Sequence, residues 1–252
     1  MNILDKIVKE KTNHLKYLKQ KKYKIKKNKS SFYRSIEKEI RKGNNALIAE
    51  FKRFSPSIDR FKEIKFLQNT ISDYDKSDCC CISILTDKNF GGSLNDLIIA
   101  KKLTSKPLIR KDFIINKKQI EESKQYGADA ILLIAKILTK KNLTQLYNYS
   151  ISIGLDVLIE IENKNEVKKI ADVNAKLVGI NNRNLREQKI DINKSIELAN
   201  ILKKTIIVSE SGVNKKNIKS IKQNSNISSF LIGGSILNQK NKVSYINSLY
   251  LS

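Results

Sequence analysis

Three consecutive charges follow a short apolar run near the middle of this 252-residue chain. The run Pro107-Leu108-Ile109 is typical of a buried strand, and Arg110, Lys111 and Asp112 come directly after it. A lysine at the carboxyl end of a buried strand is more typical of an active-site edge than of a surface turn. The alternative is that the charges only solvate the strand end, so the interpretation depends on how other strands end.

Other apolar runs also end in residues that could do chemistry. Glu50 and Lys52 follow the run 46–49, and Glu160 lies inside the run 157–161, where an unpaired carboxylate would be costly to bury. Later runs are followed by polar or small residues, namely Asn181 and Arg183, then Glu210 with Ser211 and Gly212, then Gly233 with Gly234. If the strands form a barrel, these ends surround one mouth and the side chains converge on one pocket.

The last two strand ends together predict a phosphate site. Ser211-Gly212 and Gly233-Gly234 place small residues where backbone N–H groups can approach a ligand closely. Barrels frequently bind a phosphate group between the loops that follow strands 7 and 8. Glycine also has ordinary structural uses at such turns, so the prediction of a phosphate site depends on the two pairs occurring together.

Eight short apolar runs position these residues, and segments with helical periodicity lie between them. The runs are 46–49, 81–85, 107–109, 130–134, 157–161, 177–180, 206–208 and 230–232, and the clearest helical segments are 118–126, 138–149, 165–171 and 192–203. Alternating strands and helices with unbroken apolar strands predict a parallel α/β sheet. Eight units favour a (β/α)8 TIM barrel over a doubly wound sheet, which usually has a glycine-rich first turn.

An extra helical segment is predicted before the barrel. Apolar residues have roughly helical spacing over 3–22 and again over 30–42, and Gly43 is expected to end the second helix. We therefore predict a single domain over 1–252, with residues 1–44 as an N-terminal helical extension and 45–252 as the barrel.

The net charge of +24 raises the question of nucleic-acid binding. The lysines are spread along the chain with many isoleucines and asparagines, which indicates codon bias, and the dense run 19–27 contains one tyrosine and no arginine. We therefore expect no nucleic-acid partner, although a diffuse positive field favours anionic substrates. Charged N-terminal residues and the lack of a long apolar stretch predict a cytoplasmic protein outside the membrane.

The three cysteines are adjacent, which argues against a metal site. Neighbouring residues in a strand point to opposite faces, so Cys79, Cys80 and Cys81 cannot close around one ion. They are expected to be small apolar residues at the start of a strand, in a reducing compartment. No metal is predicted.

Seven motifs, in order and at strand ends, resemble the indole-3-glycerol-phosphate synthase family, in its monofunctional form. These motifs are Ile48–Ser57, Ser83–Asp87, Leu108–Ile114, Gly127–Ile134, Leu158–Ile161, Gly179–Leu185 and Ser209–Gly212. The resemblance implies a carboxy-lyase of tryptophan biosynthesis that needs no cofactor. It would close 1-(2-carboxyphenylamino)-1-deoxyribulose 5-phosphate to indole-3-glycerol phosphate with loss of CO2 and water.

The resemblance also implies residue roles. Lys111 would be the general acid in ring closure, Glu160 would transfer protons in the dehydration, and Lys52 would pair with the anionic substrate and share acid duty. Other substrate contacts would come from Glu50, Ser55, Pro56, Phe90, Phe113, Leu132, Asn181, Arg183 and Glu210, of which Phe90, Phe113 and Leu132 would form the aromatic ring pocket. The phosphate-binding residues would be Ser211, Gly212, Gly233 and Gly234, with Ser55 beside them.

Physical chemistry adds expectations for the same residues. Ring closure onto a ketone requires proton donation as charge builds on oxygen, and a lysine near other cations is expected to have a lowered pKa suited to that. Arg110 is expected to point away from the mouth and serve the fold, while the role of Asp112 stays open. A monomer is the expected state.

Three departures and two alternatives accompany the resemblance. Ile58-Asp59 stands where the family usually has Lys-Gly, the loop near Phe90 looks one residue short, and Gly234 stands where a serine or glutamate is common. A phosphoribosylanthranilate isomerase would use a Cys/Asp pair at strand ends, and no cysteine lies at one. A basic RNA-binding protein on a decayed barrel would have lost catalytic residues, yet each expected position is filled.

Overall fold

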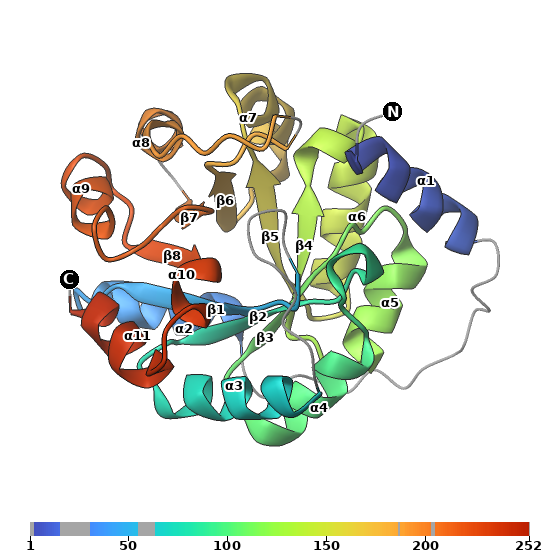
Figure 1. Cartoon of the computed structure of the whole chain (residues 1–252). Helices are drawn as coiled ribbons and strands as arrows, with labels where there is room; N and C mark the ends of the chain where they lie inside the picture. The colour runs from blue at the N-terminus through green and yellow to red at the C-terminus, as the bar shows by residue number, and fades with distance from the viewer. Residues whose placement is uncertain (1–2, 16–30, 55–63, 186, 203–204, 252) are drawn as a thin grey trace.

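The protein is a closed barrel of eight parallel strands in chain order, surrounded by helices (Figure 1). A computed structural model describes residues 3–15, 31–54, 64–185, 187–202 and 205–251. The strands are β1 Ala46–Phe51, β2 Cys81–Leu85, β3 Leu108–Lys111, β4 Ala130–Ile134, β5 Asp156–Ile161, β6 Leu177–Asn181, β7 Ile206–Glu210 and β8 Ser229–Ile232. The (β/α)8 prediction is therefore confirmed.

The helices of the described ranges alternate with the strands and add two elements at each end of the chain. They are α1 Ile3–Leu15, α2 Phe32–Arg41, α3 Ile64–Lys76, α4 Asn95–Leu103, α5 Lys117–Gln125, α6 Lys140–Ser152, α7 Lys164–Ile170, α8 Asn193–Ala199, α9 Ile218–Gln223, α10 Gly234–Leu237 and α11 Lys242–Tyr250. Three short 3-10 helices are η1 Lys88–Phe90, η2 Ala135–Ile137 and η3 Ala171–Val173.

Several strands continue beyond the apolar runs that predicted them. Glu50, Lys111, Asn181 and Glu210 lie inside strands rather than after them. A barrel strand keeps its hydrogen bonds up to the mouth, where inward side chains meet the pocket and become polar. The predicted helices 118–126, 138–149, 165–171 and 192–203 correspond to α5 to α8 with shifted ends, and 203 lies outside the described residues.

Side chains alternate between two cores along each strand. Ile82 and Ile84 of β2 pack outward against the helices, whereas Cys81 of the same strand faces the barrel interior with Ile109 and Leu158. This alternation follows from the two-residue period of a strand. It places Lys111 inward, because Ile109 two residues earlier faces the interior, and Arg110 outward.

The N-terminal extension supplies helices that pack against the barrel interior. Phe32 and Ile36 of α2 are fully buried in the inner core with Ala46 at the start of β1. Ser31 caps α2 and its hydroxyl donates to Asp156 Oδ2 at 2.8 Å, which fixes the helix to the amino end of β5. Gly43, with a φ of 80°, follows α2 as predicted.

The cysteine cluster divides between the two cores. Cys79 packs in the outer core and Cys81 in the inner core, and the half-buried Cys80 packs against the inner core; all three are free thiols. No group of metal-binding side chains occurs in the described ranges. Over those same ranges no helix is long and apolar enough to cross a membrane.

Candidate active site

The carboxyl ends of the strands surround a cavity of about 370 Å³. Fourteen of the residues predicted for the site line it: Glu50, Lys52, Phe90, Lys111, Phe113, Leu132, Glu160, Asn181, Arg183, Glu210, Ser211, Gly212, Gly233 and Gly234. The other two, Ser55 and Pro56, lie outside the described residues, as do Ile58 and Asp59. The structure thus brings the described candidates to one pocket.

A lysine lies between two buried carboxylates at the centre of this cavity. Lys111 Nζ is 2.5 Å from Glu210 Oε2 and 3.2 Å from Glu160 Oε2. The two carboxylates come from β5 and β7, and both are nearly inaccessible to solvent. Beside them, Lys52 Nζ is 2.6 Å from Glu50 Oε1, so β1 supplies a second cation–carboxylate pair to the same pocket.

Glu160 is held by the last residue of the neighbouring strand β6. Asn181 Nδ2 donates to Glu160 Oε1 at 3.1 Å, and Asn181 Oδ1 accepts from the Arg183 backbone N–H at 3.0 Å. The Arg183 guanidinium donates to the Gln188 carbonyl at 3.1 Å, which closes the loop between them. Oε1 of Glu160 is therefore held by Asn181, and Oε2 accepts from Lys111. This orientation is suited to proton transfer.

One end of the cavity is apolar and flat. The Phe90 and Phe113 rings are stacked at 17° with centroids 6.2 Å apart, and Leu132 lies in the same lining. Leu4 and Ile7 of α1 also line the cavity. Sequence reasoning missed these two, because their helical spacing indicates only that the helix packs on something.

Small residues line the cavity where β7 and β8 end. Ser211 and Gly212 have φ values of 65° and 76°, and a Cβ on Gly212 would lie 2.6 Å from Ile190 Cγ2. A Cβ on Gly233 would lie 2.5 Å from Glu50 Oε1, so this glycine makes room for that carboxylate. Asn214, which the sequence did not single out, also lines the cavity.

Comparison with known proteins decides the family. The profile of the family described as indole-3-glycerol phosphate synthase matches residues 4–249. The chain belongs to this family. The indole-3-glycerol phosphate synthase of Aquifex aeolicus (strain VF5) is 40% identical over 214 residues, covering 83% of this chain and 82% of the relative. That of Staphylococcus aureus (strain bovine RF122 / ET3-1) is 38% identical, covering 99% and 97%.

One relative is longer than this chain, and one solved structure shares its barrel. The tryptophan biosynthesis protein TrpCF of Buchnera aphidicola is 37% identical, and this chain spans 55% of its length. Among solved structures, 3-hexulose-6-phosphate synthase from Salmonella typhimurium superposes with a TM-score of 0.66 at 12% identity, covering 81% of this chain and 96% of that one. At that identity the likeness concerns the barrel alone. The predicted family, with its carboxy-lyase class and its pathway, is confirmed.

The charge state of the central lysine contradicts one prediction. Burial alone would lower the pKa of Lys111, but Glu210, Glu160 and Glu50 outweigh it and raise the pKa well above the usual lysine value. The expected lowering, attributed to nearby cations, is wrong because the groups that face this ammonium are carboxylates. In this member of the synthase family the lysine therefore carries its proton throughout the physiological range.

The carboxylates around the lysine differ in how they respond to it. Burial raises the pKa of Glu210 to about 7, with Lys111 opposing the shift and Glu160 adding to it. One oxygen of Glu210, Oε1, is buried and has no hydrogen-bond partner among the described residues. Burial would also raise the pKa of Glu50, but Lys52 and Lys111 lower it. The synthase pocket thus holds one carboxyl poised near neutrality and one that stays ionised.

Proposed function

We propose that this chain catalyses the family reaction, the closure of 1-(2-carboxyphenylamino)-1-deoxyribulose 5-phosphate to indole-3-glycerol phosphate. The observation that carries the proposal is Lys111 Nζ between the carboxylates of Glu210 and Glu160, at 2.5 and 3.2 Å. An apolar end with stacked phenylalanines lies in the same cavity as a glycine-rich end with exposed backbone. A substrate with an aromatic ring at one end and a phosphate at the other matches this polarity.

Lys111 is the proposed general acid for ring closure. A ring carbon of the substrate attacks the ketone carbon, a carbon–carbon bond forms, and the ketone oxygen takes a proton from the ammonium. The raised pKa of Lys111 ensures that the ammonium carries the proton. When Glu210 is neutral, it stabilises the ammonium less, so the proton is released more readily. The carboxylate on the ring then leaves as CO2, and its bonding electrons restore the aromatic ring.

Glu160 is the proposed group for the dehydration that follows. The new hydroxyl leaves as water after gaining a proton, and the adjacent carbon or nitrogen loses one, so the indole double bond forms without a change in oxidation state. Glu160 Oε2 lies against Lys111 and Oε1 against Asn181, so proton transfer needs little movement. Lys52, paired with Glu50, is proposed to bind the anionic substrate and to share acid duty.

The phosphate end is proposed to bind through backbone. Ser211, Gly212, Gly233 and Gly234 lie at the ends of the seventh and eighth strands, the position where barrels commonly hold phosphate. Ser55 and Pro56, which follow β1 in the sequence, are also proposed contacts. These roles complete a substrate site that spans the mouth from Phe113 to Gly212.

The test is formation of indole fluorescence from the purified protein and the proposed substrate. Lys111→Met is expected to lower kcat by about 100-fold or more while substrate binding is largely kept, as for loss of a general acid. Lys102→Met on the exposed face of α4 is the matched control and should behave as wild type. Normal turnover by the Lys111 variant would exclude this residue as the acid, and a folded wild type without product would overturn the assignment.

We further propose a monomeric cytoplasmic protein with one barrel domain, extended by residues 1–44, and with no nucleic-acid partner. Three free thiols, two of them buried, suit a reducing compartment. Size-exclusion chromatography with light scattering tests the monomer, and a mass near 28.8 kDa is expected.

A further inference from the structure

One lysine of α1 binds two buried carboxylates at the edge of the pocket. Lys11 Nζ is 2.8 Å from Asp87 Oδ2 and 2.5 Å from Asp112 Oδ1. Asp87 has no solvent exposure and Asp112 only 2%. Ionised carboxylates at such sites need a partner of opposite charge, so the two aspartates make a strong docking point for a lysine.

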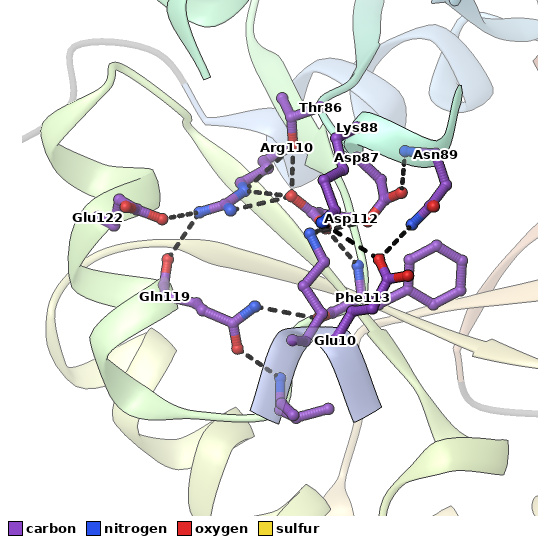
Figure 2. A network of polar contacts seen from close by, with 12 residues as sticks. Glu10, Thr86, Asp87, Lys88, Asn89, Arg110, Asp112, Phe113, Gln119 and Glu122 are labelled. Carbon is purple, nitrogen blue, oxygen red and sulfur yellow. Dashed lines mark hydrogen bonds and ion pairs between the residues drawn. The ribbon is translucent and has the colours of Figure 1, made fainter. Parts of the chain in front are cut away.

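Each aspartate fixes the loop that carries one phenylalanine of the ring pocket. Asp87 caps η1 by accepting from the Asn89 N–H at 2.8 Å, and its carbonyl accepts from the Phe90 N–H at 3.1 Å. Asp112 Oδ1 accepts from the Phe113 N–H at 2.8 Å, as Figure 2 shows. Because both carboxylates bind the same ammonium, the lysine joins the two loops whose rings stack on each other.

The same helix adds the remaining apolar wall. Leu4 and Ile7, exposed by only 6% and 2%, line the cavity that Phe90 also lines. Positions 4, 7 and 11 fall on one face of a helix. Docking of Lys11 therefore brings Leu4 and Ile7 over the ring end of the pocket.

Asp112 also binds a cation that belongs to the barrel itself. Arg110 Nη2 is 2.9 Å from Asp112 Oδ2 and Nη1 is 3.1 Å from Glu122 Oε2, which ties β3 to α5 as predicted (Figure 2). Burial would raise the pKa of Asp112, but Arg110 and Lys11 lower it well below the usual range. Without Lys11, Asp112 keeps the arginine, whereas Asp87 loses the cation that pairs with it among the described residues.

We propose that Lys11 is a positioning residue that assembles the aromatic end of the substrate site. By holding Asp87 and Asp112 together it orders the two phenylalanine loops and closes α1 over the ring. The inference rests on the proposed function for the identity of the ring, and it gives Asp112 the role that the sequence left open.

The test separates the two ends of the site by binding. The first probe is a ketone-reduced analogue of the substrate, which keeps the carboxyphenyl ring and the phosphate but cannot close the ring. Its own fluorescence reports binding, because the chain contains no tryptophan. The second probe is inorganic phosphate, measured by its competition with the analogue.

Lys11→Met is expected to lower the affinity for the analogue and to raise KM, each by about tenfold or more. The reason is that the variant loses one well-packed wall of the ring site. Its inhibition constant for phosphate should stay within about twofold of wild type, since Lys11 contacts Asp87 and Asp112 after β2 and at the end of β3, whereas the proposed phosphate site follows β7 and β8. Lys11→Arg, which keeps the charge, should recover most of the loss. Lys9→Met, on the exposed face of the same helix, should match wild type.

A double variant separates positioning from charge balance. Lys11→Met leaves the buried Asp87 carboxylate without its cation, so the variant is also expected to melt at a lower temperature. Adding Asp87→Asn removes that charge and should restore the melting temperature but not the affinity for the analogue. Three outcomes would overturn the proposal. The double variant could regain both the melting temperature and the affinity for the analogue. Alternatively, Lys11→Met could bind phosphate and analogue with equally reduced affinity, or it could behave like Lys9→Met.

The design also distinguishes the two proposals from each other. Wild type that binds the analogue but makes no indole product contradicts the proposed function and leaves the Lys11 comparison valid. Normal turnover combined with unchanged binding in Lys11→Met contradicts the positioning role alone.

Discussion

At the scale of single residues, Glu210 gives the site a pH dependence that stability measurements can detect. Its pKa in the folded protein is about 7, against an ordinary value of 4.5, so the folded state binds this proton more tightly than the unfolded chain. The stabilisation from that proton is complete below about pH 4.5 and is lost as pH rises through 7. The folded protein should therefore lose stability from this group between pH 5 and 8.

Glu210→Gln is expected to remove that loss. Relative to the variant, wild type should lose on the order of 2–3 kcal/mol of unfolding free energy between pH 5 and 8. Urea unfolding at four pH values measures the difference, and Glu197→Gln, exposed on α8, serves as the control. If the unfolding free energies of wild type and Glu210→Gln change with pH in parallel, burial does not raise the pKa of Glu210.

The convergence of these residues on one pocket could be predicted from the sequence, but their charge states could not. Lys111, Glu160 and Glu210 are predicted because each lies inside an apolar run or within two residues of its end. The pKa of Lys111 was predicted with the wrong sign, since it depends on which groups face the ammonium across the barrel. Residues 160 and 210 are far from it in sequence, and only the closed sheet places them within 3.2 and 2.5 Å.

At the scale of elements, Gly179 on β6 leaves room for Glu210 on the neighbouring strand β7, which binds the proposed acid Lys111. A Cβ on Gly179 of β6 would lie 2.0 Å from Glu210 Oε1 on β7. Gly179 has an ordinary negative φ, so alanine fits its backbone and only the carboxylate must move. Because Glu210 Oε2 binds Lys111, any such movement also displaces the proposed acid.

Gly179→Ala is therefore expected to lower kcat by at least about tenfold, since misplacement by 1 Å can cost more than that. Val178→Ala, on the outward face of the same strand, should lower the melting temperature but leave kcat close to wild type. Steady-state kinetics on both variants decides the matter. A Gly179→Ala variant with the kcat of wild type would mean that Glu210 moves without displacing Lys111.

The strands could be predicted better than the role of the first helix. Unbroken apolar runs identify buried parallel strands because both faces of each strand are covered. The apolar stripe of α1, in contrast, has the same spacing whether the helix packs on the outside, at the base or over the mouth of a barrel. Its position depends on Lys11 reaching Asp87 and Asp112, a contact between residues about 75 and 100 positions apart that no local pattern encodes.

At the scale of the whole molecule, the net charge of +24 is best understood through the charges of the pocket. The charged side chains that line the described cavity are three cations, Lys52, Lys111 and Arg183, and four anions, Glu50, Asp112, Glu160 and Glu210. With all of them ionised, the lining carries a formal net charge of −1 and cannot attract a substrate with a phosphate and a carboxylate from a distance. The lysines spread over the surface must supply that attraction.

Ionic strength tests this field directly. Raising potassium chloride from about 20 to 500 mM shortens the Debye length from roughly 20 to 4 Å, so long-range attraction is screened while contacts in the pocket persist. We expect kcat/KM to fall by about tenfold with kcat nearly unchanged, because steering acts on encounter rather than on chemistry. Potassium acetate should give the same curve, since the effect depends on ionic strength. A fall with chloride alone would indicate anion competition at the phosphate end, and a flat profile would mean that the surface lysines do not steer the substrate.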